Sequence, residues 1–305
     1  MPNLSRRTLL AATTASIATH ALPAFAAAPY SFRHGAFEVT VVSDGHLVLP
    51  TSFLAPAAPP AEREAVLRAA GETGEQYNSP TNVTLIRTTE ELILVDMGSG
   101  DRFMPSAGKL WDNLKAAGID KSKITKVIFT HGHPDHLWGA VDELDDLVTP
   151  DATFFVAGNE WNFWTGDNAT RGLPPERAGF VTGARRNYAA IKNKVKMVKP
   201  GDDVVAGLRL IDTPVHTQGH VSLELAGAGG LIVGGDVLTH PLISFQHPDW
   251  RPTADHVPEQ AAATRAKLLD RLATDRAKLI GFHLPYPGVG IVERKDLAYR
   301  LVPMV

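Results

Sequence analysis

The chain has 305 residues, of which 44% are hydrophobic and 21% charged, and its formal net charge is −3 at pH 7. This is the composition of an ordinary globular protein, and the slight negative charge argues against a nucleic-acid partner or an anionic membrane surface. The absence of cysteine excludes disulfides and thiolate ligands, so any metal ion would be held by nitrogen and oxygen atoms.

The first residues have the features of an export signal. Residues 5–10 read Ser-Arg-Arg-Thr-Leu-Leu, a twin-arginine pattern, and an Ala/Thr-rich run follows. The Ala-Phe-Ala at residues 24–26 fits a small-x-small cleavage site. A membrane anchor is the alternative, but the run is short and weakly hydrophobic. The sequence therefore predicts a Tat-type signal over residues 1–26, a soluble periplasmic bacterial product with no membrane partner after processing, and one domain over residues 27–305.

The first part of this domain reads as strands and short helices. Residues 37–45 alternate apolar and polar side chains and end in Ser-Asp-Gly, which predicts a strand and a hairpin turn, with a second strand over residues 46–49. A Pro/Ala-rich loop follows. The further elements that we expect are a helix over residues 61–70, a strand pair over 82–88 and 91–95, an amphipathic helix over 107–117 and a buried strand over 124–129.

The next stretch, residues 130–136, packs three imidazoles and a carboxylate into one loop, Thr-His-Gly-His-Pro-Asp-His. His131 and His133 are two apart and can point to one side of an extended loop. Asp135 and His136 come at the start of a short helix and can face a second position. A chance His-rich surface loop is the alternative, but the density of the pattern and its place after a buried strand favour a metal site. One loop can therefore serve two metal ions.

The pattern His-x-His-x-Asp-His at residues 131–136 resembles the signature of the metallo-β-lactamase superfamily. The resemblance implies an α/β fold, a four-layered αββα sandwich, and further metal ligands downstream. It also bears on Asp96, which follows the strand over residues 91–95 in an Asp-x-Gly turn. The family's carboxylate at this place usually supports a metal-bound His. A purely turn-forming Asp is the equal alternative.

An aromatic-rich segment comes next in the chain. Residues 161–164 read Trp-Asn-Phe-Trp, and Phe180 follows before a helix expected over residues 185–193. Such aromatic side chains either pack the segment onto the body or wall an apolar substrate pocket. We assign packing to most of them, place Trp164 toward the pocket, and keep Phe180 as a further candidate for its wall.

Three apolar strands in the second half are each followed by a residue that matches a ligand of the family. They are a strand over residues 208–212 before His216, a strand over 231–236 that ends on Asp236, and a strand over 279–283 that ends on His283. In the segment around His216, His220 more often braces the loop, and we expect a structural role. The resemblance implies two metal sites, with His131, His133 and His216 on one, Asp135, His136 and His283 on the other, and Asp236 between them.

Two divalent ions at such a centre can share a water, lower its pKa and present a bridging hydroxide as nucleophile while they polarise an oxygen of the electrophile. Asp135 and Asp236 are the catalytic residues that the resemblance implies. The nitrogen and oxygen ligands accept Zn²⁺ by default, with Mn²⁺, Fe²⁺ or Co²⁺ as alternatives. The expected reaction is the hydrolysis of a neutral, ester-like small-molecule substrate.

Three stretches, at residues 42–50, 283–290 and 299–303, look like the methyl parathion hydrolase branch of the superfamily. That branch implies an exported dinuclear enzyme, usually a homodimer, with an aromatic pocket for aryl phosphotriesters or aryl esters. A quorum-quenching lactonase is the alternative. Lactonases of this kind often carry a Tyr three residues after the bridging Asp, where this chain has Thr239. An iron-dependent redox member of the superfamily is a third and less favoured alternative.

Overall fold

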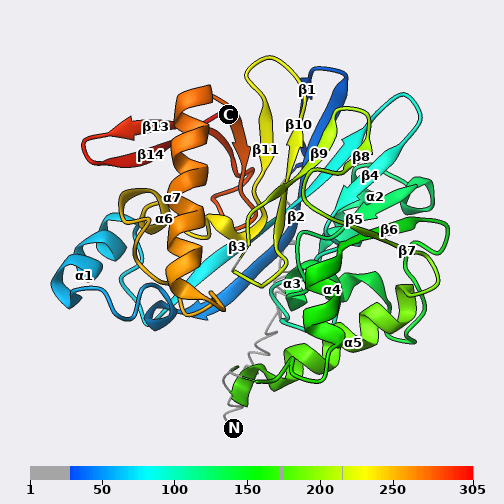
Figure 1. Cartoon of the computed structure of the whole chain (residues 1–305), viewed down its shortest axis with the longest axis horizontal. Coiled ribbons are helices and arrows are strands. Elements are labelled where there is room, and N and C mark those ends of the chain that lie inside the picture. The colour runs from blue at the N-terminus through cyan, green and yellow to red at the C-terminus, as the bar shows by residue number, and fades with distance from the viewer. Residues whose placement is uncertain (1–27, 172, 174, 215, 305) are drawn as a thin grey trace, which may run out of the picture.

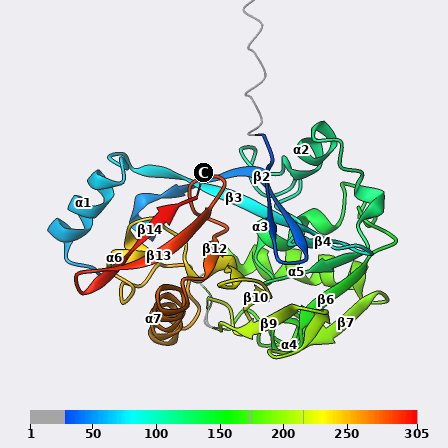
Figure 2. The same cartoon turned by 90° about the horizontal axis from the view of Figure 1, so that it is seen from above.

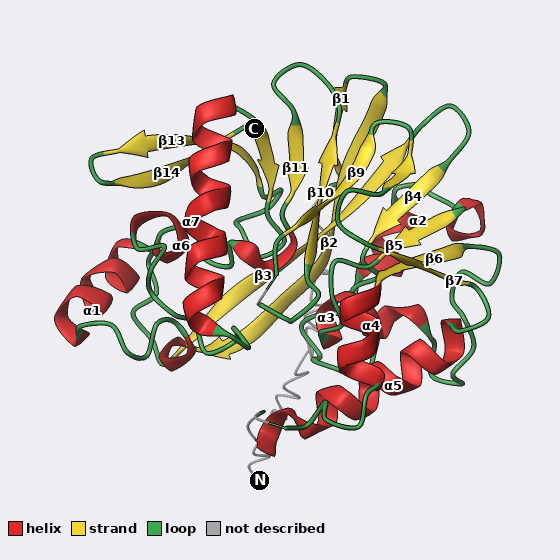
Figure 3. Cartoon of the chain, in the orientation of Figure 1, coloured by secondary structure: helices red, strands yellow, loops and turns green. Residues whose placement is uncertain are grey.

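The structure is a computed structural model and describes residues 28–171, 173, 175–214 and 216–304. The predicted export signal over residues 1–26 lies outside these residues. The strands of the described residues form two seven-stranded sheets, and each half of the chain contributes one of them (Figure 3).

The N-terminal half builds the first sheet, whose strands lie side by side in the order of the chain. These strands are β1 (Tyr30–His34), β2 (Phe37–Pro50), β3 (Gln76–Arg87), β4 (Leu92–Val95), β5 (Lys126–Ile128), β6 (Thr153–Ala157) and β7 (Val195–Val198). The neighbours from β1 to β4 are antiparallel, whereas β4, β5, β6 and β7 run parallel. The carboxyl ends of β4 and β5 therefore lie at the same edge of the sheet.

The C-terminal half builds the second sheet, in the order β14-β13-β12-β11-β10-β9-β8. These strands are β8 (Asp203–Val205), β9 (Leu208–Asp212), β10 (Val221–Leu225), β11 (Leu231–Val233), β12 (Lys278–Ile280), β13 (Val289–Lys295) and β14 (Ala298–Pro303). Strands β11 and β12 are parallel and the other neighbours are antiparallel. This parallel pair also ends at one common edge.

Helices lie on the outer faces of the sheets and at one end of the molecule, where α1 stands (Figures 1 and 2). They are α1 (Pro60–Ala69), α2 (Leu110–Ala116), α3 (Pro134–Leu137), α4 (Gly158–Thr165), α5 (Ala178–Ile191), α6 (Ile243–Gln246) and α7 (Pro258–Asp275). Helix α1 corresponds to the helix predicted over residues 61–70. Among the described residues, no helix has both the length and the apolar character needed to cross a membrane.

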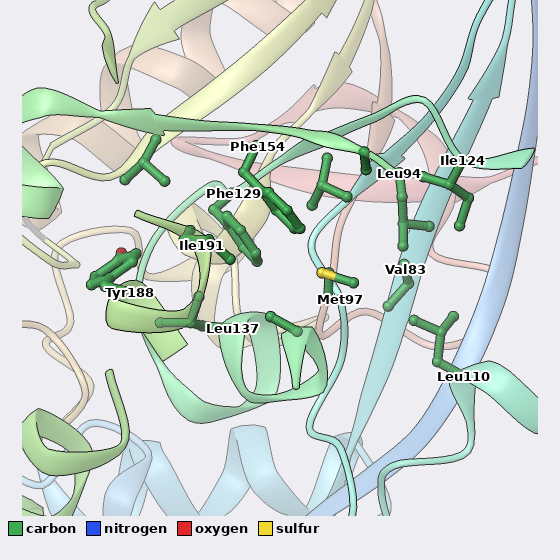
Figure 4. Packing of buried hydrophobic residues seen from close by; sticks show 14 of the residues in the cluster. Val83, Leu94, Met97, Leu110, Ile124, Phe129, Leu137, Phe154, Tyr188 and Ile191 are labelled. Atoms are coloured by element: carbon green, nitrogen blue, oxygen red, sulfur yellow. The ribbon is translucent and has the colours of Figure 1, made fainter. Parts of the chain in front are cut away.

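Side chains of the first sheet alternate between two hydrophobic layers. On β4, Leu92 and Leu94 belong to a cluster with residues of α2, α3 and α5, whereas Ile93 and Val95 belong to a cluster shared with the second sheet. Figure 4 shows Leu94 in the outer cluster together with Leu137 of α3. A strand that is buried on both faces needs a continuous apolar run, which β4 has.

The second sheet is buried in the same way. On β12, Ile280 packs into the layer between the sheets, and Leu279 packs outward with Leu268 and Leu272 of α7. The layers are thus helix, sheet, sheet and helix. The predicted αββα sandwich is confirmed.

The predicted hairpin turn at residues 43–45 is wrong. The chain continues through Ser43, Asp44 and Gly45 as a single strand, β2, which pairs with β3 on both sides of a β-bulge at this point. Gly45 has a φ of +103°, and its amide donates to Ser43 Oγ at 3.0 Å. Ser-Asp-Gly therefore forms a bulge that needs a positive φ, and the chain does not reverse.

Two helices differ in length from the prediction. The helix predicted over residues 107–117 occurs as the shorter α2, which begins at Leu110, where the backbone N–H donates to Asp44 Oδ1 at 2.9 Å. The helix predicted over residues 185–193 is the last part of α5, which begins at Ala178. The chain thus has more helix after the aromatic segment than the sequence pattern indicated.

Candidate metal centre

The loop after β5 carries four of the predicted ligands. The chain is extended at His133, and Pro134 begins the short helix α3. His131 and His133 therefore precede the helix, whereas Asp135 and His136 lie in its only turn. All four side chains are buried, so the loop directs them into the molecule.

A first cluster joins this loop to the second sheet. His133 Nδ1 lies 3.0 Å from His131 Nε2 and 2.9 Å from His216 Nε2. Asp236 Oδ2 lies 3.3 Å from His216 Nε2 and 3.9 Å from His131 Nε2. His216 comes from the loop after β9, and Asp236 from the 3-10 turn Gly235–Val237 after β11. The four side chains offer ligand atoms within 4.8 Å of one another.

A second cluster shares Asp236 with the first. His136 Nε2 lies 3.1 Å from Asp236 Oδ1 and 3.5 Å from Asp135 Oδ2. His283 Nε2, from the loop after β12, lies 3.1 Å from Asp236 Oδ2 and 3.3 Å from Asp135 Oδ2. The structure thus brings together all seven predicted ligands, with Asp236 in the position that both clusters share.

The donor atoms of these clusters fit divalent cations. Burial lowers the pKa values of His131 and His133 well below their ordinary range, so both rings are neutral and offer lone pairs. Asp135 Oδ2, His136 Nε2 and Asp236 Oδ1 are buried without a hydrogen-bond partner among the described residues. Buried polar atoms of this kind call for a ligand. Two cations held by imidazole nitrogen and carboxylate oxygen would satisfy them.

Negative charge is concentrated at the second cluster. Burial lowers the pKa of His136, but the carboxylates of Asp236, Asp135 and Asp96 raise it well above its ordinary value. Burial also lowers the pKa of His283, yet Asp236 and Asp135 raise it to about 10. A site that binds a proton this tightly favours a cation in the proton's place.

Asp96 contacts the metal loop from the end of β4. Its Oδ2 lies 2.8 Å from His136 Nδ1 and accepts the Thr130 hydroxyl at 2.8 Å, and its Oδ1 accepts the Thr130 amide at 2.8 Å. A carboxylate at Nδ1 fixes the His tautomer that leaves Nε2 free. Asp96 also has a φ of +64°. The residue therefore both forms the turn after β4 and contacts His136, so the two interpretations of Asp96 are compatible.

The two imidazole ligands from the second half of the chain, His216 and His283, are oriented in a similar way. Asp255 Oδ1 lies 3.1 Å from His216 Nδ1, and Arg265 donates to Asp255 Oδ2 at 2.8 Å. His283 Nδ1 donates to the Pro80 carbonyl at 2.8 Å. In both His residues the Nδ1 contact turns Nε2 toward the clusters.

His220 lies beside the clusters and belongs to neither of them. Its Nδ1 donates to the Thr213 carbonyl at 3.0 Å, and its Nε2 accepts the Asp236 amide at 3.0 Å. Both ring nitrogens are therefore engaged with the chain. This geometry agrees with the structural role expected from the sequence, since His220 fixes the main chain of the shared carboxylate.

A cavity of about 160 Å³ opens over the two clusters. The floor is polar and includes the side chains of Asp135, Asp236 and His283. The walls are mainly apolar and are formed in part by Leu47, Leu49, Phe53, Leu54, Phe103 and Phe180. Phe180 thus lies where the sequence placed it, and Thr239 also lines the cavity.

Trp164 does not line this cavity, and its predicted place at the pocket is wrong. The side chain is fully buried, and its indole N–H donates to Glu160 at 2.6 Å. Its ring packs edge-on against His133, with 5.7 Å between the ring centroids. Helix α4 turns this aromatic residue inward because its N–H has a buried carboxylate partner there.

Sequence reasoning missed several residues around the centre. Tyr77 and Ser79, two apart on β3, both line the cavity, and the buried Tyr77 hydroxyl bonds to Ser79. Arg177 also lines it and donates to the Thr253 carbonyl at 2.7 Å. The run of polar residues at the start of β3, Gln-Tyr-Asn-Ser over residues 76–79, was the available signal for the first two. Nothing local in the sequence marks Arg177 or the buried carboxylates Glu160 and Asp255.

Residues 77–283 match the family model of the metallo-beta-lactamase superfamily, and the chain belongs to this superfamily. It is similar to the probable metallo-hydrolase YflN of Bacillus subtilis (strain 168), with 30% identity over 170 residues. That match covers 52% of this chain and 61% of YflN, which is less than two thirds of the relative's length. A second relative, metallo-beta-lactamase domain-containing protein 1 of Xenopus laevis, is 26% identical over 200 residues. That match covers 64% of this chain and 69% of the relative.

Two solved structures resemble nearly the whole chain. AidC, a dizinc quorum-quenching lactonase in complex with a product, superposes with a TM-score of 0.85 and 27% identity, over 91% of this chain and 98% of that one. The hydrolase AbOPH of the beta lactamase superfamily superposes with a TM-score of 0.84 and 28% identity, over the same shares of the two chains. The chain thus combines the fold of this superfamily with candidate metal-binding His and Asp clusters.

Proposed function

We propose that the protein is a dinuclear metal-dependent hydrolase that cleaves an ester-type bond in a neutral, mostly apolar small molecule. The observation that carries this proposal is the cavity, in which apolar walls rise directly from the polar floor formed by the two clusters. Such a cavity accepts uncharged apolar groups and leaves one polar bond of the substrate at the floor.

The chemistry follows from the floor of the cavity. Two divalent cations, when bound, would activate a water as nucleophile and polarise the attacked carbonyl or phosphoryl oxygen. Asp135 Oδ2 and Asp236 Oδ1, which are buried and lack hydrogen-bond partners in the described chain, would hold these cations. The proton that the water releases would go to the carboxylate oxygen of Asp135 that no cation occupies. Phe103 and Phe180 exclude bulk water from the reacting bond.

A lactone is the first substrate class that we propose. The similarity to a dizinc lactonase over nearly the whole chain supports it. Opening a lactone produces an alkoxide, which needs a proton. Thr239 cannot supply a phenol, but Tyr77 lines the same cavity from β3 and would present its hydroxyl to this leaving group.

An aryl phosphotriester or aryl ester, as in the methyl parathion hydrolase branch, is the second class. Phe103 and Phe180 favour it because their rings meet edge to face, with centroids 5.8 Å apart, in the cavity wall. An aromatic leaving group would pack against this pair. A phenolate leaving group needs no acid, so Tyr77 should not matter for it.

The test is kcat/KM for an acyl-homoserine lactone, an aryl phosphotriester and an aryl ester, measured on the zinc-loaded protein. Chelation should abolish turnover, and zinc should restore it. Tyr77→Phe should lower kcat for the lactone by roughly 100-fold, the contribution of a general acid, and should leave the phosphotriester unchanged. Phe180→Ala should raise KM for both aryl substrates. If none of the three is turned over in a metal-dependent way, the proposed substrate class is wrong.

We also propose Tat export to the periplasm and a homodimeric state, both on the sequence alone. The twin arginines Arg6 and Arg7 support the first proposal. Replacing both with Lys should leave the precursor in the cytoplasm, and processed protein in the periplasm of a Tat-deficient host would contradict it. Sedimentation of the processed protein tests the second proposal, since a monomer at micromolar concentration would exclude a stable dimer.

A further inference from the structure

Glu160, on α4, is a buried carboxylate that lies behind the metal centre. Its side chain accepts four hydrogen bonds. Oε1 accepts the amide of Gly132 at 2.8 Å and the indole N–H of Trp164 at 2.6 Å. Oε2 accepts the hydroxyl of Thr217 at 2.8 Å and the amide of Gly219 at 2.9 Å. All four donors are neutral, so the carboxylate is held by hydrogen bonds alone in these contacts.

Two of these partners lie next to metal ligands in sequence. Gly132 separates His131 from His133, and Thr217 directly follows His216. The three imidazoles of the first cluster therefore come from two loops, one from each half of the chain, and Glu160 bonds to both loops. None of its four hydrogen bonds reaches the loop after β12, which carries His283 of the second cluster.

The fit around Glu160 leaves little room for rearrangement. A Cβ added at Gly219 would lie 2.1 Å from the Glu160 backbone nitrogen, and a Cβ added at Gly132 would lie 2.5 Å from Trp164 Nε1. Glycine at both positions lets the loops approach α4 closely. The distance between the loops is thus set by the carboxylate and its surroundings.

We propose that Glu160 is a positioning residue that sets the metal affinity of the first cluster, formed by His131, His133 and His216 with Asp236. It does so by fixing the distance between the two loops. Removing a contact that orients metal ligands costs roughly 10- to 100-fold in metal affinity. The hydrogen bonds from Thr217 and Gly219 hold the loop of His216, which serves the first cluster only, whereas the loop of Gly132 carries ligands of both clusters. The loss should therefore be larger at the first site than at the second.

The experiment compares zinc binding by the protein over residues 27–305 and by its Glu160→Gln variant. The amide keeps the size of the side chain but places an NH₂ group against two of the four donors. Zinc titration against a chromophoric chelator gives the number of sites and their dissociation constants. The wild type should bind two equivalents, and Glu160→Gln should weaken one site by roughly 10- to 100-fold and the other by a clearly smaller factor. Glu64→Gln, the same chemical change on the exposed face of α1, is the matched control and should change neither site.

A second variant covers the case in which Glu160→Gln does not fold. Thr217→Val removes one donor to Oε2 and leaves the carboxylate in place, so it should weaken the same site by a smaller factor. Co²⁺ in place of Zn²⁺ adds an optical spectrum, in which the bands of one cobalt site should change more than those of the other. Two wild-type affinities in Glu160→Gln, or equal weakening of both sites, would overturn the inference.

This inference rests on the proposed metal sites, and the two can fail separately. Wild-type protein that takes up fewer than two equivalents of zinc would contradict the dinuclear centre itself. Wild-type protein with two equivalents and an unaffected Glu160→Gln variant would leave the centre standing and remove only the role of Glu160.

Discussion

The carboxyl group of Asp44 ties together segments of the chain that are far apart in sequence. Its Oδ2 accepts the amides of Ser99 at 2.8 Å and Gly108 at 3.2 Å, and its Oδ1 accepts the amide of Leu110 at 2.9 Å. A Cβ at Gly98 would lie 2.6 Å from Asp44 Cγ, so glycine is needed for this approach. Burial raises the pKa of Asp44 from 3.8 to about 6, against the opposing effect of these hydrogen bonds.

This pKa predicts how the stability of the fold depends on pH. The folded protein binds the proton of Asp44 more tightly than the unfolded chain does, so the contribution is greatest below the unfolded pKa and is lost as pH rises through the folded pKa. Asp44→Asn removes the titration. The free energy of unfolding of the wild type minus that of the variant should therefore fall by about 2 kcal/mol between roughly pH 4 and pH 7. Urea unfolding of the metal-free proteins measures it, and a difference that stays constant with pH would contradict the assignment.

The metal ligands could be predicted from the sequence, but the buried residues that position these ligands could not. His131, His133, Asp135 and His136 are close enough in sequence to form a pattern, and each later ligand follows an apolar strand by a few residues. Buried carboxylates such as Glu160 bond to backbone amides and to distant side chains. A backbone amide looks the same in every residue but proline, so such a contact leaves no trace in the sequence.

At the scale of the element, the bulge in β2 shapes the first sheet. Gly45 has a φ of +103°, and a Cβ there would lie 2.2 Å from the Ser106 carbonyl oxygen. The amide of His46 donates to the same carbonyl at 3.1 Å. The bulge thus brings β2 against the loop before α2, and residues after it continue toward the cavity, where Leu47 and Leu49 form part of the wall.

Replacing the bulge glycine should destabilise the fold through two effects, which a control separates. Gly71 also has a positive φ, of +83°, but its added Cβ would meet no atom within 4 Å. Gly71→Ala should therefore cost only the backbone strain, about 1–2 kcal/mol. Gly45→Ala carries the same strain and an overlap with rigid backbone, so its loss in the free energy of unfolding should be at least about twice as large. Equal losses in denaturant unfolding would show that the overlap relaxes freely.

Elements for which the apolar pattern and the flanking residues agreed, such as β9 and α1, were predicted well. The turn at residues 43–45, which rested on one local signal, was not. The strand over residues 208–212 is β9, and the helix over 61–70 is α1 to within one residue at each end. Ser-Asp-Gly at residues 43–45 gave a single local signal, a positive φ, which serves a bulge as well as a turn. Pairing with β3 decides between them, and that pairing is not local.

At the scale of the whole molecule, the two sheets meet at the metal centre. The N-terminal half provides two ligands to each cluster, and the C-terminal half completes both. The superfamily resemblance gave this division correctly because it pointed to residues in both halves. It could not give the shape of the cavity, which depends on side chains such as Tyr77 and Arg177 that come from separate elements.

Metal removal should therefore lower the stability of the whole fold. Chelation should reduce the midpoint of thermal unfolding, because zinc binds the folded state. Free zinc above both dissociation constants should add about 1.4 kcal/mol for each site, or about 2.7 kcal/mol for both, with each ten-fold increase. Asp236→Asn, which alters the ligand common to both clusters, should largely remove the response. Calorimetry over a zinc series checks this, and a midpoint that is independent of zinc would argue against cations in these clusters.

The chain passes from the first sheet to the second within a few residues, between Val198 at the end of β7 and Asp203 at the start of β8. A cut at residues 199–202 would leave every ligand on one fragment or the other and neither cluster complete on either. Metal uptake by the two fragments would then be second order, with a rate that scales with the product of their concentrations. The intact chain, by contrast, loads at a rate per molecule that dilution of the protein does not change. Metal uptake would therefore report whether the two halves of the polypeptide have associated.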